Sequence, residues 1–202
     1  MIDFALISYV GIMSVTPGPN NLLLAASGVN FGWRRTLPQM FGISLGCLVL
    51  VFVVTALFGT VVGFFTGIRP WLAVVGGGYL LWLSWEILRA GAPEEKEGRR
   101  PMKLLESALF QFVNPKAWVM VINAALFFGP RHGELWPALV LTLTFVVINL
   151  PCVALWAFAG DRLRRFLAQG KAALVFNAVM AVLMAATAVW LVAEEFLRPG
   201  KA

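Results

Sequence analysis

Charged residues are scarce in this sequence. Only 13% of its 202 residues are charged and 60% are hydrophobic, whereas soluble domains carry about a quarter charged and about 45–50% apolar residues. A soluble core of this size has no use for so much apolar surface, so the excess must face something other than water. The composition excludes a soluble globular protein and favours an all-α polytopic membrane protein, because about 20 residues span a bilayer and the apolar residues suffice for about six helices.

Cysteine and histidine are rare as well. Cys47 and Cys152 each lie in an apolar run without a Cys-x-x-Cys pair, and the single histidine, His132, has no neighbouring metal ligands. This pattern is typical of small packing residues rather than of thiol redox or metal chemistry, so we expect no cofactor and no metal. The basic residues interrupt apolar runs instead of forming a stripe with aromatics, which argues against nucleic acid as a partner despite the net charge of +6.

Apolar windows between prolines, glycines and charged clusters predict six membrane-spanning segments. They cover residues 4–27, 39–66, 70–88, 105–128, 135–159 and 172–196, and the loops between them are 28–38, 67–69, 89–104, 129–134 and 160–171. All these loops are too short for a second domain, so residues 1–202 are expected to form a single transmembrane domain. The start of the chain lacks the basic n-region of a cleavable signal peptide, and we expect it to remain in the mature protein.

The basic residues of the loops are distributed unequally. With six spans, both termini lie on one side with the loops 67–69 and 129–134, and that side carries four basic residues. The other side carries eleven: Arg34, Arg35, Arg89, Lys96, Arg99, Arg100, Lys103, Arg162, Arg164, Arg165 and Lys171. Because cytoplasmic loops are enriched in Lys and Arg, we expect these eleven inside and both termini outside. A re-entrant first segment would place the N-terminus alone inside.

Prolines occur at matching places in the two halves of the chain. Pro17 and Pro115 interrupt the first and fourth segments, 98 residues apart, and Pro38 and Pro137 open the second and fifth, 99 residues apart. The sequence therefore predicts two repeats, about 1–93 and about 102–202, joined by a charged linker. Each repeat has three spans, an odd number, so the second must be inverted relative to the first. Inverted repeats with broken helices are typical of alternating-access transporters.

The first segment is interrupted at the polar stretch 14–21, Ser-Val-Thr-Pro-Gly-Pro-Asn-Asn. Its two prolines lack amide hydrogens and so free the carbonyls of Met13 and Val15 from the helix, while the glycine between them lets the chain turn. A second half-helix is expected to restart near Pro19, with a positive end that suits a carboxylate. An ordinary proline kink is the alternative. The candidate substrate-binding residues here are Thr16, Pro17, Gly18, Pro19, Asn20 and Asn21.

The corresponding stretch of the fourth segment is 111–116, Gln-Phe-Val-Asn-Pro-Lys, where the proline frees the carbonyl of Gln111. Lys116 is the only Lys or Arg well inside any predicted span. A charge at that depth costs about 2.5–3.5 kcal/mol on insertion scales, so we expect it to face a polar interior or an acceptor; snorkelling toward the cytoplasm is the alternative. The candidate substrate-binding residues of this stretch are Gln111, Asn114, Pro115 and Lys116.

No carboxylate lies at the depth of Lys116, since every Asp and Glu of the predicted spans is near a segment end. A permanently anionic site for a cationic substrate is therefore not expected, and a zwitterionic or neutral solute fits better. Asn149 is a further candidate for substrate binding, because it precedes Pro151 in the fifth segment, where a third break is expected. The glycines at 42 and 46, at 59, 63 and 67, and at 76–78 suit close helix packing.

Several of these motifs together resemble the LysE/RhtB family of amino-acid exporters. They are residues 16–21 (TPGPNN), 42–46 (GISLG), 78–85 (GYLLWLSW) and 110–118 (FQFVNPKAW), and the resemblance covers nearly the whole chain. Among family members, the pair Asn20-Asn21 and the stretch 111–114 are most similar to cysteine/O-acetylserine exporters. The chain departs from the family at Asn20, where many members carry an acid, and at Glu86, where a basic residue is common.

The resemblance implies a bacterial inner-membrane secondary transporter, not an enzyme. It implies export of a small neutral amino acid or derivative, either cysteine/O-acetylserine-like or threonine/homoserine-like, driven by a proton or ion gradient. The expected partners are the amino acid and the lipid bilayer, and a homo-oligomer is left open. Two alternatives from other classes remain at this point, a membrane-embedded enzyme or redox relay on a similar broken-helix scaffold and a passive small-solute channel.

Overall fold

The computed structural model describes residues 4–89, 100–130, 134–167 and 172–197, and in this part of the chain all regular structure is helical. The helices are α1 (Phe4–Val15), α2 (Pro19–Phe31), α3 (Trp33–Ala56), α4 (Phe58–Leu88), α5 (Leu104–Val113), α6 (Pro115–Phe128), α7 (Leu135–Leu167) and α8 (Ala172–Leu197). Among the described residues, four helical stretches are long and apolar enough to cross a membrane: α3, the Pro70–Leu88 part of α4, α7 and α8. The fold class is therefore an all-helical, multi-pass membrane protein, as predicted.

Both predicted breaks in the first and fourth segments are present. α1 ends at Val15 and α2 restarts at Pro19, while α5 ends at Val113 and α6 restarts at Pro115. Pro19 and Pro115 each occupy the first residue of the new helix, where the fixed φ of proline suits the helix and its missing amide removes no hydrogen bond. The prolines thus end one helix and begin the next.

Three predicted loop boundaries and one predicted break are wrong. Residues 67–69 are helical, because α4 continues through Pro70 and the chain turns earlier, at Leu57. Only Gly32 of the predicted loop 28–38 lies outside a helix. Of the predicted loop 160–171, residues 160–167 belong to α7. Helix α7 also continues through Pro151. A single proline removes one hydrogen bond and kinks a membrane helix without ending it when neighbouring groups satisfy the freed carbonyl.

Gly32 joins α2 to α3 in a left-handed conformation, with a φ of 81°. This φ favours glycine, because a side chain would clash with the backbone. Asp161 of α7 accepts a hydrogen bond from the Trp33 amide at 3.0 Å and so places a carboxylate at the positive end of α3. A single residue with a special backbone conformation therefore replaces the loop that the sequence predicted.

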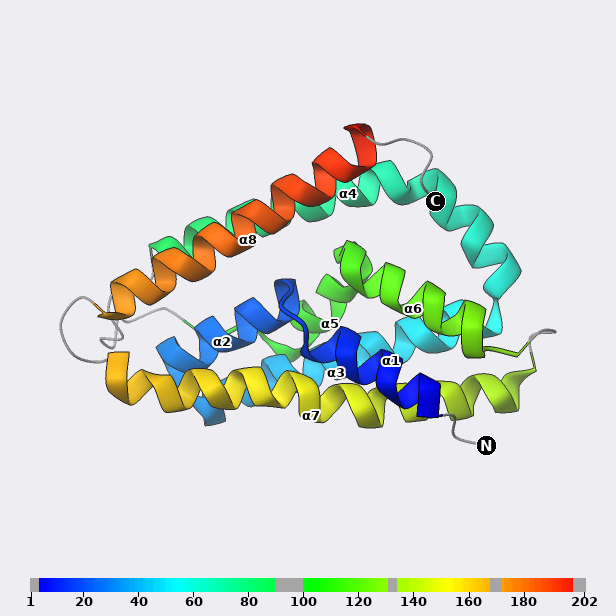
Figure 1. The fold of residues 1–202 in the computed structure, drawn as a ribbon, viewed down its shortest axis with the longest axis horizontal. Coiled ribbons are helices and arrows are strands. Elements are labelled where there is room, and N and C mark those ends of the chain that lie inside the picture. The colour runs from blue at the N-terminus through cyan, green and yellow to red at the C-terminus, as the bar shows by residue number, and fades with distance from the viewer. Residues whose placement is uncertain (1–3, 90–99, 131–133, 168–171, 198–202) are drawn as a thin grey trace.

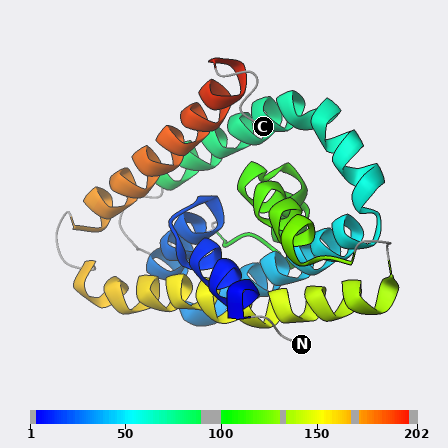
Figure 2. The ribbon, with the colours of Figure 1, turned by 45° about the vertical axis from the view of Figure 1, so that its right-hand side comes forward.

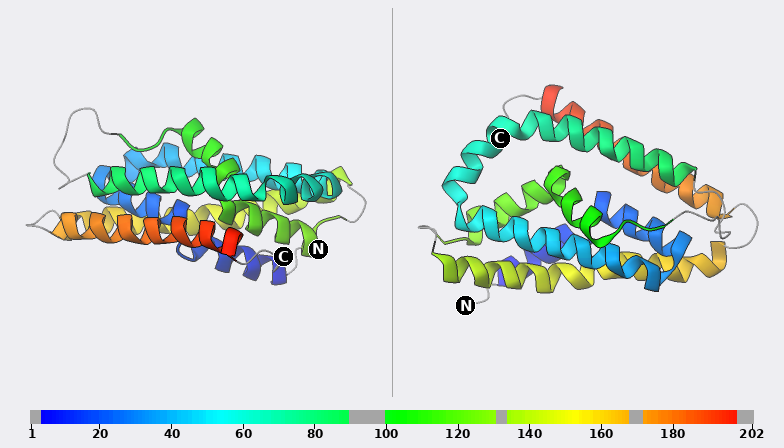
Figure 3. Two further views of the ribbon diagram at one scale, coloured as in Figure 1. Left: turned by 90° about the horizontal axis from the view of Figure 1, so that it is seen from above. Right: turned by 180° about the vertical axis from the view of Figure 1, so that it is seen from behind.

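The helices form two groups. α8 packs against the later part of α4, and the two form one edge of the molecule, while the first part of α4 bends away toward α3, as Figures 1 and 3 show. On the opposite edge α7 packs against α1, α2 and α3, and α3 also contacts α5. The ends of α1 and α2 meet between these two edges, and α5 and α6 lie beside them (Figure 2). The two breaks are thus inside the molecule.

Glycines bring several helices into backbone contact. A Cβ at Gly42, Gly46 or Gly76 would strike backbone carbonyls of α5, so the predicted packing role of these three is confirmed. Gly63, Gly67 and Gly78 instead face open space, so the predicted packing role is wrong for these three. The tightest mutual contact was not predicted from the sequence: Gly28 of α2 lies against the carbonyl of Ala157, and Gly160 of α7 lies against Ala25 of α2.

The predicted linker agrees with the structure at its ends, since α4 ends at Leu88 and α5 begins at Leu104. Arg100 pairs with Glu106 at 2.6 Å near the start of α5. Residues 90–99 of the linker lie outside the described residues, as do His132, Lys171 and both termini, so the predicted orientation of the termini stays a prediction.

The α2–α7 contact predicts the effect of a methyl group at Gly28. In Gly28→Ala the new Cβ would lie 2.9 Å from the Asp161 amide nitrogen and 3.1 Å from the Gly160 carbonyl carbon, so the helices must separate. Overpacking of this kind costs about 1–3 kcal/mol. We expect a lower melting temperature of the protein in detergent. The control is Gly78→Ala, for which we expect no loss of stability, since its Cβ meets open space and alanine favours helix; equal melting temperatures for the two variants would contradict this packing.

Candidate functional site

The carbonyls freed at the first break are both satisfied by protein groups. The Thr16 hydroxyl donates to the Met13 carbonyl at 3.0 Å, and the Trp156 indole N–H of α7 donates to the Val15 carbonyl at 3.0 Å. The buried Asn21 amide donates across the break to the carbonyls of Ser14 and Thr16, both at 2.8 Å. The break is therefore a fixed structure and more than a kink.

The second break is closed in a similar way. The Asn114 amide N–H donates to the freed Gln111 carbonyl at 3.4 Å, and the Asn114 side-chain oxygen accepts from the Lys116 amide at 3.2 Å, which caps α6. The Trp118 indole donates to the Phe112 carbonyl at 2.9 Å. In each break a tryptophan thus satisfies a carbonyl at the end of the first half-helix.

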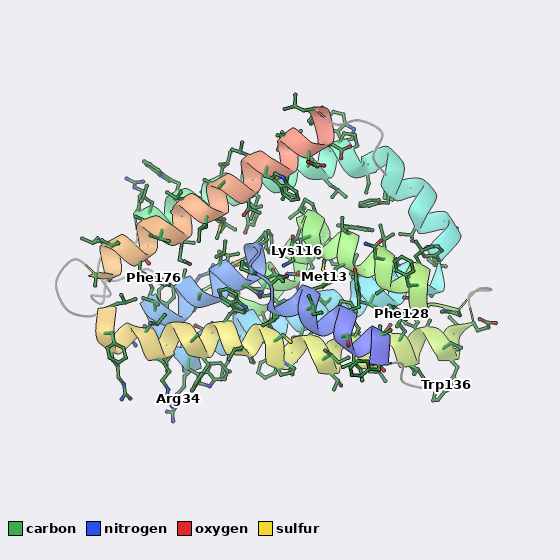
Figure 4. All side chains as sticks on the ribbon, viewed as in Figure 1. Met13, Arg34, Lys116, Phe128, Trp136 and Phe176 are labelled. Atoms are coloured by element: carbon green, nitrogen blue, oxygen red, sulfur yellow. The ribbon has the colours of Figure 1, made fainter. Side chains whose placement is uncertain are left out.

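Lys116 joins the two breaks. Its ammonium donates to the Thr16 carbonyl at 3.0 Å, the Thr16 hydroxyl at 3.0 Å and the Pro17 carbonyl at 3.1 Å. A cation at this end of α1 is stabilised by the negative end of the helix dipole. The acceptor predicted for Lys116 is present, and the snorkelling alternative is wrong. Figure 4 places Lys116 and Met13 close together in the middle of the molecule.

Gly18 makes room for the lysine. A Cβ at this position would lie 2.7 Å from Cδ and 2.8 Å from Nζ of Lys116. The backbone of Gly18 is extended, with φ −179° and ψ 177°, so close approach rather than a special φ requires glycine here. No side chain caps the amino end of α2 at Gly18, which leaves this positive helix end open toward the site.

Two amide side chains, Asn20 and Gln111, pair across the breaks. Asn20 Nδ2 donates to Gln111 Oε1 at 2.8 Å, and Gln111 Nε2 donates back to Asn20 Oδ1 at 3.1 Å. Gln111 also donates to the Ser107 carbonyl at 3.0 Å, and the Cys47 thiol lies 3.8 Å from Gln111 Oε1. Candidates from segments about 90 residues apart are therefore in direct contact.

Asn149 of α7 is, with Gln39 of α3, one of two buried side chains that keep a polar atom without a partner among the described residues. Its Nδ2 donates to the Ser14 hydroxyl at 2.9 Å, but its Oδ1 is buried and has no partner among the described residues. Asn149 lines a polar cavity of about 20 Å³ together with Ser14, Asn20, Asn114 and Lys116. A cavity of this size holds about one water molecule.

A larger cavity of about 420 Å³ lies on the other side of Lys116. The first break and the start of α6 form one wall, and Thr187, Trp190 and Leu191 of α8 form the other. These α8 residues were not among the candidates, because an isolated threonine and two apolar residues in a predicted span carry no sequence signal. Lys116 and Gly18 line both cavities.

The chemistry of the site is that of recognition. It offers one ammonium, several amide side chains and the ends of four half-helices. The described residues contain no group of three or more His, Cys, Asp or Glu that could hold a metal, and Cys47 and Cys152 are free thiols. A polar chamber at the meeting point of two broken helices, inside an apolar helical protein, is typical of a membrane transporter.

The comparisons with known proteins agree with this class. The LysE type translocator family matches residues 11–195, and the chain belongs to this family. It is therefore a membrane translocator and not an enzyme. No solved structure matches the chain.

Three relatives are each named cysteine/O-acetylserine efflux protein. The chain is 30% identical to the protein of Klebsiella pneumoniae over 192 residues, which are 94% of this chain and 96% of the relative. It is 30% identical to the protein of Salmonella paratyphi A over 159 residues, 78% and 82% of the two chains. It is 27% identical to the protein of Escherichia coli K12 over 183 residues, 90% and 93%.

The Asn20–Gln111 pair predicts coupled effects on stability. In a double-mutant cycle of Asn20→Ala and Gln111→Ala, each single change removes a partner of the amide that remains, so the double variant should be less destabilised than the sum of the two. We expect a coupling energy of about 0.5–3 kcal/mol in detergent unfolding. The control cycle combines Gln111→Ala with Asn177→Ala, whose side chain pairs with Asn30 instead, and should be additive. Additivity in both cycles would argue against the pair.

Proposed function

We propose that this protein exports small neutral amino acids or close derivatives, of the cysteine and O-acetylserine kind, from the cytoplasm across the bacterial inner membrane. The observation that carries the proposal is the bridge from Lys116 to the carbonyl end of α1. It places an ammonium, backbone acceptors and open helix ends within one small polar chamber. The names of the relatives, cysteine/O-acetylserine efflux protein, support the substrate class.

The chamber offers complementary groups for both ends of an amino acid. The α-carboxylate would meet Lys116 and the uncapped amino end of α2. The α-ammonium would meet the unpartnered Oδ1 of Asn149, beside Ser14. The remaining candidates hold this geometry: Asn21 and Asn114 fix the two breaks, and Asn20 pairs with Gln111.

Lys116 would also control access. Its side chain lies between the 20 Å³ cavity and the 420 Å³ cavity, so the two are joined when the ammonium leaves Thr16 and Pro17. A substrate carboxylate competes for the same ammonium and offers the stronger, charge-assisted hydrogen bond. Binding of the substrate thus favours opening of the partition, which is a step that alternating access requires.

Two inverted repeats of three spans are the architecture that fits this mechanism. α1 with α2, α3 and α4 would form the first repeat, and α5 with α6, α7 and α8 the second, with the broken pair leading in each. The packing of α4 on α8 and the central position of both breaks support this pairing. The eleven basic loop residues would face the cytoplasm, and a proton or ion gradient would drive export.

The substrate class is tested by overexpressing the protein in a bacterium and measuring which amino acids accumulate in the medium. We expect cysteine, O-acetylserine or both to rise several-fold over cells with an empty vector. If none of cysteine, O-acetylserine, threonine, homoserine and leucine accumulates, amino-acid export is wrong. Efflux that runs only down the concentration gradient of the amino acid and that an uncoupler leaves unchanged would indicate a passive channel instead.

The site is tested with Lys116→Ala and Pro17→Ala. The first removes the ammonium, and the second restores an amide that lets α1 continue as a helix. Both should reduce export to the level of the empty vector while the protein remains in the membrane fraction. The control is Lys103→Ala, an exposed lysine at the start of α5, which should export normally. Normal resistance to excess substrate in cells carrying the Lys116 or Pro17 variant would overturn this assignment.

A further inference from the structure

The 420 Å³ cavity beside Lys116 has no role in binding the amino and carboxyl groups of a substrate. It begins at Lys116 and Pro17 and extends to Thr187, Trp190 and Leu191 of α8. It is therefore continuous with the point where the substrate carboxylate is placed. Figure 4 shows Lys116 on the side of the bundle that faces α8. A side chain attached to a carboxylate at Lys116 would extend into this space.

The walls of the cavity select against charge. Met13, Val119, Trp190 and Leu191 are apolar, and among the described residues that line it Lys116 is the only charged one. No carboxylate lies there to pair with the side chain of lysine or arginine. Burying a charged group against apolar walls without a partner costs free energy, and no interaction in this cavity offsets that cost.

The cavity can also accommodate weakly polar groups. The hydroxyl of Thr187 donates to the Leu183 carbonyl at 2.8 Å, so its oxygen retains lone pairs, and the Thr16 hydroxyl also lines the wall. An ester oxygen or a thioether is compatible with such a surface. The volume falls within the range of about 300–1,000 Å³ that is typical of small-molecule sites. The inner cavity of 20 Å³ has no such space.

We infer that this cavity is the side-chain pocket of the transporter, and that Thr187, Trp190 and Leu191 of α8 determine its specificity. It takes uncharged side chains of intermediate length, such as those of O-acetylserine, methionine and leucine, and it rejects lysine and glutamate. This inference rests on the proposed function, because the pocket is defined relative to a carboxylate at Lys116. The specificity wall comes from α8, which packs mainly on α4, whereas the charged and amide groups come from α2, α5, α6 and α7 and from Asn114 between α5 and α6.

The test is counterflow in proteoliposomes that contain the purified protein, with labelled cysteine, O-acetylserine, methionine, leucine, phenylalanine, lysine and glutamate. For the native chain we expect kcat/KM for O-acetylserine, methionine and leucine to lie within about tenfold of cysteine, with lysine and glutamate at background. Thr187→Trp fills the pocket and should lower kcat/KM for the three longer substrates at least about tenfold, while kcat/KM for cysteine changes little. The reason is that a change of one group in an apolar pocket alters the discrimination between substrates about 10–200-fold.

A second variant keeps the test decisive if the Thr187→Trp protein does not fold. Trp190→Ala enlarges the same pocket and should raise transport of phenylalanine relative to cysteine by about tenfold. The matched control is Trp71→Ala, a tryptophan of similar exposure on α4 that does not line the pocket, and it should leave all ratios unchanged.

The outcomes separate this inference from the proposed function. Equal loss of all substrates in Thr187→Trp, or unchanged ratios in both pocket variants, would overturn the side-chain pocket. Transport of cysteine by the native chain without the longer substrates would also overturn the pocket but leave amino-acid export standing. Absence of counterflow for the whole panel would instead refute the proposed function.

Discussion

The contact between the Lys116 ammonium and the carbonyl end of α1 is the constraint on which the rest of the interior depends. A cation in an apolar helical protein needs acceptors, and a broken helix in hydrocarbon needs donors. Each requirement is met by the other: Lys116 satisfies the carbonyls of Thr16 and Pro17, and the break gives the lysine three oxygen partners. Neither feature would be stable alone, which explains why the two breaks lie side by side.

The amide side chains extend this arrangement by satisfying the remaining groups without adding charge. Asn21 holds two carbonyls of the first break, Asn114 caps α6 and Asn20 pairs with Gln111. Buried polar networks stabilise one conformation when nearly every member has a partner. The exception here is Asn149 Oδ1. A ligand that donates a hydrogen bond to this oxygen therefore removes the free-energy cost of a buried, unpaired acceptor.

The sequence predicts those parts of the structure that depend on local chemistry. Prolines lack an amide, so both breaks and the freed carbonyls of Met13 and Val15 could be located from the sequence alone. The partner of Val15 could not, because Trp156 reaches its carbonyl only through the packing of α7. Thr187 likewise lines the larger cavity only through the packing of α8, which no local pattern records. Loop prediction failed for a similar reason. The predicted loop 67–69 and the proline that follows it have the glycine and proline of a turn, yet the surrounding helix continues through them.

The link between α2 and α3 has a mechanical consequence. A single residue, Gly32, separates the two helices, and the carboxylate of Asp161 binds the first amide beyond it. Only the few dihedral angles at this joint can change, so α2 can pivot against α3 but cannot slide along it. The far end of α2 is the open helix end at Pro19. A rotation at Gly32 would displace that end, at the first break, more than the residues next to the joint, and the close contact of Gly28 and Gly160 between α2 and α7 opposes such a rotation.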